Sequence, residues 1–385
     1  MYRNPFTPIF GGKPSSFFGR QDILNRFDAA LIDQGSDYRA LFLTGTRGSG
    51  KTVLLEQLSQ RAVRKGWRVI DLGPEGTADA LVRRLVRHSE ATSTISPQMS
   101  VSVLGSGVSA SGVSKSKTIT YPAQDLSIIL QEAVEKELKG VLVTIDEVQK
   151  VTQQDMSAVC DAFQMASRKG HSVMIAVAGL PYAHDEIIHY RGCTYMRRAA
   201  HEEIGLFGRM EVREAFVGAM TRTEGLSLDD AALDRLVAAS MGQPYLVQLL
   251  GYYVVGQAID EGHVGTYEIG EKEMRPMIPL AVQTYKERAL APLLSELSPL
   301  ETNYLESMSH VLDERHVART ADVARQLGRE QQQLSRARDN LLRNGLIIAP
   351  QRGVVRFNVP YLRDYVQEAG NVLSKTARLA EEWDV

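Results

Sequence analysis

Residues 41–54 are Leu-Phe-Leu-Thr-Gly-Thr-Arg-Gly-Ser-Gly-Lys-Thr-Val-Leu. The first four form a short apolar run that predicts a buried strand, and the residues from Lys51 onward predict a helix to about Lys65. Between them, residues 45–52 fit the pattern G-x-x-x-x-G-K-[ST]. Its glycines let successive backbone N–H groups turn inward around an anion, and the helix N-terminus adds positive potential. We therefore predict a phosphate-binding turn at the end of a buried strand.

Two residues at the end of this turn carry its chemistry. Lys51 can reach the β- and γ-phosphates of a nucleotide, and Thr52 can hold Mg²⁺. The predicted ligands are therefore ATP and Mg²⁺. The predicted binding residues are Gly45, Thr46, Arg47, Gly48, Ser49, Gly50, Lys51, Thr52 and Val53.

A second buried-strand pattern ends in two acids. Residues 141–145 are Val-Leu-Val-Thr-Ile, and Asp146 and Glu147 follow directly. At the carboxyl end of a parallel strand, Asp146 can hold Mg²⁺, while Glu147 can orient and deprotonate the water that attacks the γ-phosphate. The two acids could instead cap the helix that follows. The phosphate turn favours the catalytic interpretation.

Strand and helix patterns alternate over residues 21–205, which predicts the α/β fold of a P-loop NTPase core. Strands are expected at residues 41–44, 67–72, 141–145 and 172–178, with helices between them. Parallel neighbours need crossover connections, so helices should cover the faces of the sheet. Residues 91–122 interrupt this order with a Ser/Gly/Val-rich stretch that suits a protruding hairpin and a mobile loop equally.

Smaller units are predicted on either side of this core. Residues 1–20 read as an irregular arm. After Leu206 the β-like runs stop, and helical patterns near residues 212–220, 229–240, 245–259 and 277–290 predict a helical lid over residues 206–290. Residues 291–385 are predicted to form a winged helix-turn-helix followed by a C-terminal helix.

This C-terminal segment is basic in a chain whose net charge is −2. Between Arg315 and Arg356 nine arginines, no lysine and three acids give a local balance of +6. Two helical patterns separated by Gly328 precede a hairpin, an order typical of winged helices. Such a unit would bind double-stranded DNA, although many winged helices dock protein, and an Arg-rich face can be plain solvated surface. The candidate DNA-binding residues are Gln332, Gln333, Arg336 and Arg338 on the second helix and Arg352 at the wing tip.

Together these motifs resemble a known family. Phe18-Gly19-Arg20 before a helix, the phosphate turn, Asp146-Glu147-Val148-Gln149 and Gly242-Gln243-Pro244 look like the archaeal-type ATPases of the STAND class, relatives of AAA+ replication initiators. The resemblance covers most of residues 15–255. It implies that Arg20 and Pro244 lie beside the base of ATP. Without it, Gly242-Gln243-Pro244 would be a plain helix break.

The chain also departs from the pattern of that family. Residues 178–181, Ala-Gly-Leu-Pro, offer no polar side chain where AAA+ proteins usually present one to the γ-phosphate, and Gln243-Pro244 replaces the arginine found in initiators. These departures imply slow, switch-like hydrolysis. Arg197 and Arg198 match the region that supplies an arginine finger in related proteins, a role that requires a homo-oligomer. They could otherwise be solvated or sheet-edge charges.

Composition narrows the remaining classes. Apolar residues make up 44% and charged residues 23% of the 385, and the longest apolar runs are too short to cross a bilayer. Cys160 and Cys193 have neither metal-ligand spacing nor a disulfide pattern, which fits a reducing cytoplasm. We therefore expect a cytoplasmic ATPase whose nucleotide controls DNA binding. The alternatives are a signalling switch whose winged helix docks a protein partner and a nucleotide-binding scaffold without turnover.

Overall fold

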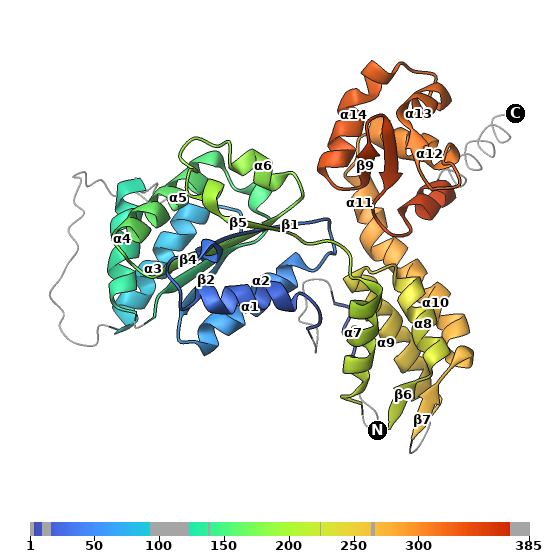
Figure 1. Ribbon diagram of the computed structural model, residues 1–385, viewed down its shortest axis with the longest axis horizontal. Helices are drawn as coiled ribbons and strands as arrows, with labels where there is room; N and C mark the ends of the chain where they lie inside the picture. Colours follow the sequence, from blue (N-terminus) through green and yellow to red (C-terminus); the bar gives the residue numbers. More distant parts are fainter. Residues whose placement is uncertain are drawn as a thin grey trace, which may run out of the picture.

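The strand before the phosphate turn, β1 (Ala40–Thr44), lies inside a five-stranded sheet (Figure 1). The computed structural model describes residues 4–9, 17–92, 123–137, 139–223, 225–262 and 266–369. The strand order is β2-β3-β4-β1-β5, and every pair is parallel. The other strands are β2 (Arg68–Leu72), β3 (Val141–Ile145), β4 (Val173–Gly179) and β5 (Ala200–Glu203). All five carboxyl ends therefore meet at one edge, which carries the phosphate turn.

Helices cover both faces of this sheet, as expected for a P-loop NTPase core. Side chains of β1 alternate between the faces, so Leu41 and Leu43 join one core while Phe42 joins the other. The first core packs against α1 (Gln21–Ala30) and α2 (Lys51–Arg64). The second packs against α3 (Thr77–Thr92), α4 (Ala123–Glu135) and α5 (Gln153–Arg168). The predicted strands and helices of the core are confirmed.

One strand of the sheet has no counterpart in the predicted set. β5 pairs with β1, but its residues Ala200, His201, Glu202 and Glu203 alternate between half-buried and exposed and include two acids. It is an edge strand, so it needs no apolar run. The predicted hairpin or loop at residues 91–122 falls almost wholly outside the described residues.

The lid contains the expected helices α7 (Arg209–Met220), α8 (Asp230–Ser240) and α9 (Pro244–Asp260). A fourth helix, α10 (Glu271–Tyr285), starts earlier than expected, because Glu273 caps the backbone N–H of Gly270 at 3.0 Å and the helix continues through two prolines. The expectation that β structure stops after Leu206 is wrong. The short strands β6 (Leu226–Leu228) and β7 (Tyr267–Ile269) form a parallel pair.

The C-terminal unit has the element order of a winged helix. It follows α11 (Ala291–Ser295) and contains α12 (Pro299–His310), α13 (Thr320–Gln326) and α14 (Gln331–Arg343). The hairpin of β9 (Ile347–Gln351) and β10 (Val354–Phe357) is joined by the two-residue strand β8 (Ala318–Arg319), giving the order β8-β10-β9. Residues 362–369 are helical.

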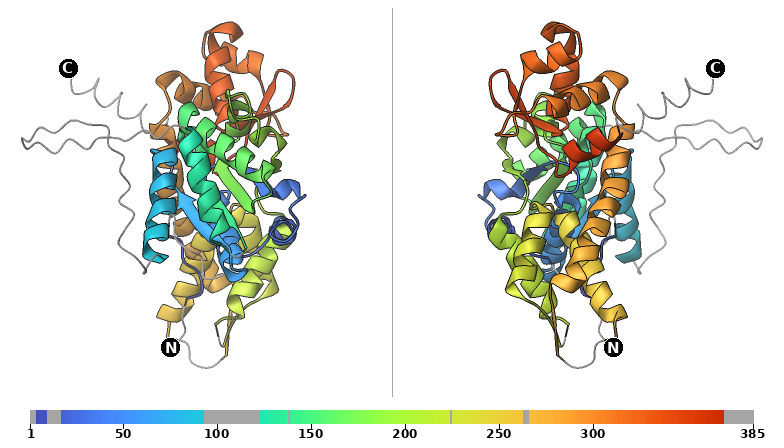
Figure 2. Two further views of the ribbon diagram at one scale, coloured as in Figure 1. Left: turned by 90° about the vertical axis from the view of Figure 1, so that its left-hand side faces the viewer. Right: turned by 90° about the vertical axis from the view of Figure 1, so that its right-hand side faces the viewer.

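The lid and the C-terminal unit are stacked along one side of the sheet domain (Figure 1). Both views of Figure 2 place the two at opposite ends of this column. One continuous hydrophobic cluster runs from Phe216 in the lid to Leu341 in the C-terminal unit, so a boundary between residues 290 and 291 stays a prediction. Among the described helices, none is long and apolar enough to cross a membrane.

Candidate nucleotide site

The phosphate turn connects β1 to α2 and depends on glycine. Gly48 and Gly50 have φ angles of 77° and 93°, a left-handed region that favours glycine. A Cβ on Gly45 would overlap the carbonyl oxygen of Ile204 and the side chain of Ser49. The turn therefore has the backbone concavity that the pattern predicted, with the N-terminus of α2 directed at it.

Lys51 and Ser49 bring polar groups into this turn below the surface. Lys51 is 6% exposed, and its Nζ donates hydrogen bonds to the carbonyl oxygens of Gly45 and Thr46, both at 2.8 Å. Burial lowers the pKa of Lys51 to about 8, against the opposing effect of Glu147 and Asp146. Ser49 is 1% exposed, and its hydroxyl has no hydrogen-bond partner among the described residues. A buried ammonium and an unpartnered hydroxyl fit a polyanionic ligand.

The two predicted metal ligands meet across the sheet edge. Thr52 lies on the first turn of α2, and Asp146 is the residue directly after β3. Thr52 Oγ1 donates a hydrogen bond to Asp146 Oδ2 at 2.6 Å. The other oxygen of Asp146 accepts from the backbone N–H of Glu147 at 2.8 Å. Within the described residues no group of three or more His, Cys, Asp or Glu side chains could hold a metal. One hydroxyl and one carboxylate suit Mg²⁺, which takes most of its other ligands from phosphates and water.

Glu147 follows Asp146 directly and lines the cleft beside the phosphate turn. Its backbone is left-handed, with φ 53° and ψ 40°. Its Oε2 accepts from Gln149 Nε2 at 2.8 Å and lies 3.4 Å from Lys150 Nζ. Glu147 stands at the N-cap of the 3₁₀ turn Val148–Lys150 but makes no side-chain cap hydrogen bond there, and α5 is capped by Thr152, which accepts from the N–H of Asp155, so the capping alternative is not supported.

A cleft of about 460 Å³ extends from the phosphate turn to the lid. A volume of this size suits a nucleotide. The far end of the cleft is mainly apolar and aromatic, with lining residues Ile9, Phe17, Phe18, Phe207, Pro244 and Val247. Arg20 and Pro244 both line this cleft, and their place beside the base of ATP stays a prediction. Arg20 is held there by Gly205, whose carbonyl oxygen accepts from its guanidinium, and lies 4.9 Å above the ring of Phe207.

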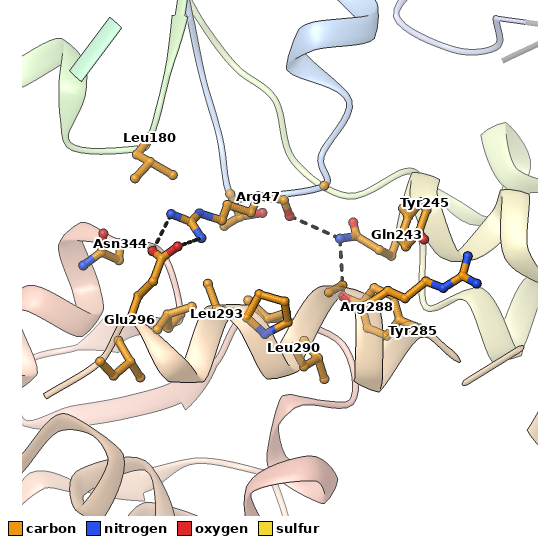
Figure 3. Close-up of a pocket in the computed structure, with 17 residues that line it drawn as sticks. Arg47, Leu180, Gln243, Tyr245, Tyr285, Arg288, Leu290, Leu293, Glu296 and Asn344 are labelled. Carbon is orange, nitrogen blue, oxygen red and sulfur yellow. Dashed lines mark hydrogen bonds and ion pairs between the residues drawn. The ribbon is translucent and has the colours of Figure 1, made fainter. Parts of the chain in front are cut away.

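Gln243 joins the lid to the phosphate turn. Its Nε2 donates to the carbonyl oxygen of Arg47 at 3.3 Å and to Tyr285 Oη at 3.4 Å (Figure 3). A Cβ on Gly48 would lie 2.7 Å from the same nitrogen. Residues 242–244 are thus more than a helix break. Sequence reasoning gave Gln243 no role beyond the missing arginine, since its contact depends on how the lid closes.

A second cavity, of about 250 Å³, lies where the phosphate turn, the lid and the C-terminal unit meet (Figure 3). At its edge the Arg47 guanidinium donates to both carboxylate oxygens of Glu296, at 2.9 and 2.6 Å. This contact lowers the pKa of Glu296. Glu296 follows α11 and was not a candidate, because nothing in its local sequence indicates that a residue so distant lies beside the turn.

Two further contacts seat the C-terminal unit on the sheet domain. Arg343, on the last turn of α14, lies 3.4 Å from Glu186 and 4.9 Å above the ring of Tyr182. Gly345 approaches the turn so closely that a Cβ there would lie 2.7 Å from Thr46 Cγ2 and 3.0 Å from a ring carbon of Pro181. The predicted winged helix therefore touches the phosphate turn directly.

The finger candidates lie away from the cleft. Arg197 and Arg198 are exposed in a 3₁₀ turn just before β5. Arg197 Nε donates to the carbonyl oxygen of Ile188 at 2.6 Å. Because β5 runs parallel to β1, this turn lies at the amino edge of the sheet, opposite the phosphate turn. As arginine fingers, these two residues could reach only a nucleotide bound to a neighbouring subunit. This role stays a prediction.

The five candidate DNA-binding residues differ in how many contacts their side chains make within the protein. Gln332, Arg336 and Arg352 are exposed. Gln333 Oε1 accepts from the backbone N–H of Glu330 at 3.2 Å and so caps α14. Arg338 is paired with Asp339 at 2.9 Å. Gln332, Arg336 and Arg352 thus have exposed side chains, whereas Gln333 and Arg338 make local contacts.

The site belongs to the P-loop nucleotide-binding class. The features that define this class are the sheet order, the phosphate turn, the Thr52–Asp146 pair and the carboxylate of Glu147. Residues 16–175 match the family model described as an AAA ATPase domain, and residues 288–366 match a domain of unknown function. This part of the chain is therefore similar to an AAA ATPase domain. No curated protein matches its sequence.

Solved structures share the fold at low sequence identity. The ORC2 protein of Aeropyrum pernix, in ADPNP and ADP complexes, is 13% identical with a TM-score of 0.61, covering 98% of this chain and 99% of that one. Its ADP form is 15% identical with a TM-score of 0.53, covering 96% and 97%. Cdc6p of Pyrobaculum aerophilum is 15% identical over 94% and 96%, with a TM-score of 0.48 that supports no inference. The chain therefore shares the fold of A. pernix ORC2.

Replacement of Lys51 with alanine should nearly abolish nucleotide binding. The change removes a buried ammonium from the turn, so we expect ATP affinity to fall by on the order of 100-fold or more in isothermal titration with Mg²⁺. Lys65→Ala, at the exposed far end of α2, is the matched control. Unchanged ATP affinity in Lys51→Ala would contradict the assignment of this site.

Binding should also take up protons near pH 8. In the protein without nucleotide, burial lowers the pKa of Lys51 to about 8. The phosphates of bound ATP favour the charged ammonium, so the pKa of Lys51 rises when ATP binds. ATP affinity should therefore be constant well below pH 8 and fall above it, by up to about tenfold per pH unit. Titration in two buffers with different ionisation heats measures the proton uptake. Lys51→Arg, which stays charged, should lose this dependence, and its persistence there would assign it to another group.

Proposed function

We propose that the protein is a slow ATPase in which bound nucleotide controls the binding of double-stranded DNA by the C-terminal unit. The proposal is carried by the contact of Arg47 with Glu296, since one residue of the phosphate turn holds the segment that leads into that unit. A nucleotide bound at the turn would change the strength of the contact between Arg47 and Glu296. The nucleotide site and the unit next to it would then act as one device.

Adenine nucleotide and Mg²⁺ are the proposed ligands. Lys51 and the backbone of the turn would hold the phosphates, and Thr52 and Asp146 would hold Mg²⁺, which neutralises charge on the phosphates when bound. The complexes of A. pernix ORC2 with ADPNP and ADP support the choice of adenine. Glu147 would take a proton from the attacking water. Slow turnover fits the end of β4, where Gly179 has no side chain to offer a γ-phosphate.

Competition for Arg47 would couple ATP to the C-terminal unit. The planar fork of a guanidinium matches a carboxylate or a phosphate equally well, but both nitrogens of this fork already bind Glu296. A γ-phosphate that recruits Arg47 would release Glu296. Both side chains are partly exposed, so their pairing contributes only about 0.5–1 kcal/mol and is easily exchanged. ADP, which lacks the third phosphate, would leave the pair intact.

DNA is the proposed partner because the exposed part of the unit is cationic. Gln332 and Arg336 lie on one face near the start of α14, while the end of α14 faces the sheet domain through Arg343. Arg352 lies at the tip of the β9–β10 hairpin. Glutamine and arginine can pair with base edges, and arginine also with phosphate. A reducing cytoplasm remains part of this proposal, in keeping with two buried free cysteines.

The second candidate is a signalling switch of the STAND kind whose C-terminal unit docks a protein. It is favoured by the ion pair of Arg338 with Asp339, which reduces the cationic surface that DNA would meet, and by the capping role of Gln333, which occupies its amide oxygen. Arg197 and Arg198 would then serve as finger residues in a homo-oligomer. The two candidates differ in their response to salt and to loss of charge.

DNA binding is tested by removing the two exposed arginines together. Arg336→Ala/Arg352→Ala should weaken duplex binding at least about tenfold and reduce the salt slope by about 2, because two phosphate or base contacts are lost. Fluorescence anisotropy over a range of salt concentrations measures both. Arg64→Ala/Arg168→Ala removes two exposed arginines from the sheet domain as a control. If the wild type shows no salt-sensitive affinity with or without ATP, DNA is not the partner.

Coupling is tested by neutralising Glu296. Glu296→Gln should tighten binding of a non-hydrolysable ATP analogue about threefold and leave ADP affinity unchanged, since only the triphosphate competes for Arg47. It should also narrow the difference in DNA affinity between the two nucleotide states. Glu271→Gln disrupts a similarly exposed pair with Arg235 in the lid and is the control. Equal changes for ATP and ADP would argue against the competition.

A further inference from the structure

Gln149 lies between the proposed catalytic carboxylate and the end of β4. We propose that Gln149 is a positioning residue that holds Glu147 in the orientation needed for hydrolysis and occupies the space beside Gly179 at the end of β4. The inference deepens the proposed function, because it rests on Glu147 acting on water. It gives a role to a side chain that the sequence motif contains but does not explain.

The amide of Gln149 makes two hydrogen bonds that fix its direction. Its Nε2 donates to Glu147 Oε2 at 2.8 Å, and its Oε1 accepts from the backbone N–H of Leu180 at 3.2 Å. A carboxylate only accepts and an N–H only donates, so reversing the amide would break both bonds. The side chain therefore spans the gap between the segment after β3 and the segment after β4.

The end of β4 has no room for a polar side chain of its own. Gly179 is its last residue, and a Cβ there would lie 2.7 Å from Ala183 Cβ and 2.9 Å from both Val148 Cγ1 and Gln149 Oε1. Any larger residue would displace the amide of Gln149. The amide of Gln149 thus fills the space that a side chain at position 179 would need. Gln149 reaches this space from the neighbouring 3₁₀ turn, Val148–Lys150.

Fixing one oxygen of Glu147 leaves the other for water. Oε2 is held by Gln149 and lies near Lys150, whereas Oε1 makes no hydrogen bond among the described residues. Rotation of a carboxylate about its last bond is broad, so an external donor is what selects one orientation. In hydrolysis the water oxygen forms a bond to the γ-phosphorus, its proton passes to Glu147, and the bond to the β–γ bridging oxygen breaks with its electrons leaving on ADP.

Alanine substitution tests the role by separating turnover from binding. Gln149→Ala should lower kcat about 10- to 100-fold, as loss of an orienting hydrogen bond does, with ATP affinity and Tm close to wild type. Gln153→Ala, an exposed glutamine at the start of α5, is the matched control and should keep the wild-type rate. A parallel loss of kcat, ATP affinity and Tm would mean that Gln149 only supports the local fold, and an unchanged kcat would overturn the proposal.

A double-mutant cycle with Glu147 gives a second readout. If Gln149 acts through Glu147, Gln149→Ala should lower the residual rate of Glu147→Gln by less than about twofold. Full additivity of the two substitutions would overturn that link. Failure of the proposed function looks different, since the wild type would then show no ATP hydrolysis above that of Lys51→Ala, and the role of Gln149 would fall with it. Hydrolysis that needs Lys51 and Glu147 but is indifferent to Gln149 would remove only the present inference.

Discussion

A backbone turn that no side chain could enter is the constraint on which the rest of this structure depends. At Gly45 a Cβ would overlap the chain entering the lid, and Gly48 and Gly50 are left-handed. These positions let the backbone N–H groups converge, and the buried Lys51 beside them adds positive charge to the turn. Alanine at Gly45 or Gly48 would also overlap neighbouring atoms, whereas at Gly50 it would cost conformational strain alone.

The parallel sheet brings the remaining chemistry to this turn. Strands β1 and β3 are separated by β4 in the sheet, yet their carboxyl ends meet at one edge, so Thr52 and Asp146 come within hydrogen-bond distance. The same edge receives Glu147 and, through β4, the backbone N–H of Leu180. The groups proposed to act on phosphate, Mg²⁺ and water are thus supplied by the residues just after a strand end. This is the general location of ligand sites in open α/β sheets.

The contacts between the phosphate turn and the C-terminal unit are weak, as the proposed switch requires. They combine ion pairs at partly exposed side chains with the close approach of Gly345 to Thr46 and Pro181. Each such ion pair contributes at most about 1 kcal/mol, so a ligand with modest differential affinity can shift the docked state. The lid side is firmer, since Tyr285, Tyr304 and Leu341 share one continuous hydrophobic cluster. Movement would therefore be expected at the turn rather than between the lid and the unit.

Local sequence determined the elements and the class of site, because glycine spacing, buried runs and caps act over a few residues. It sufficed for the turn, for four of the five strands of the main sheet and for the placement of Asp146 and Glu147 at the edge that carries the turn. Tertiary structure alone decided the contacts between segments distant in the chain: Arg47 with Glu296, Gln243 with the turn and Gly345 with Thr46. Strand β5 also belongs to this group, since a half-exposed edge strand needs only a partner and no apolar pattern. Periodicity records which side of an element is buried, whereas the partner that buries it depends on how the whole chain closes.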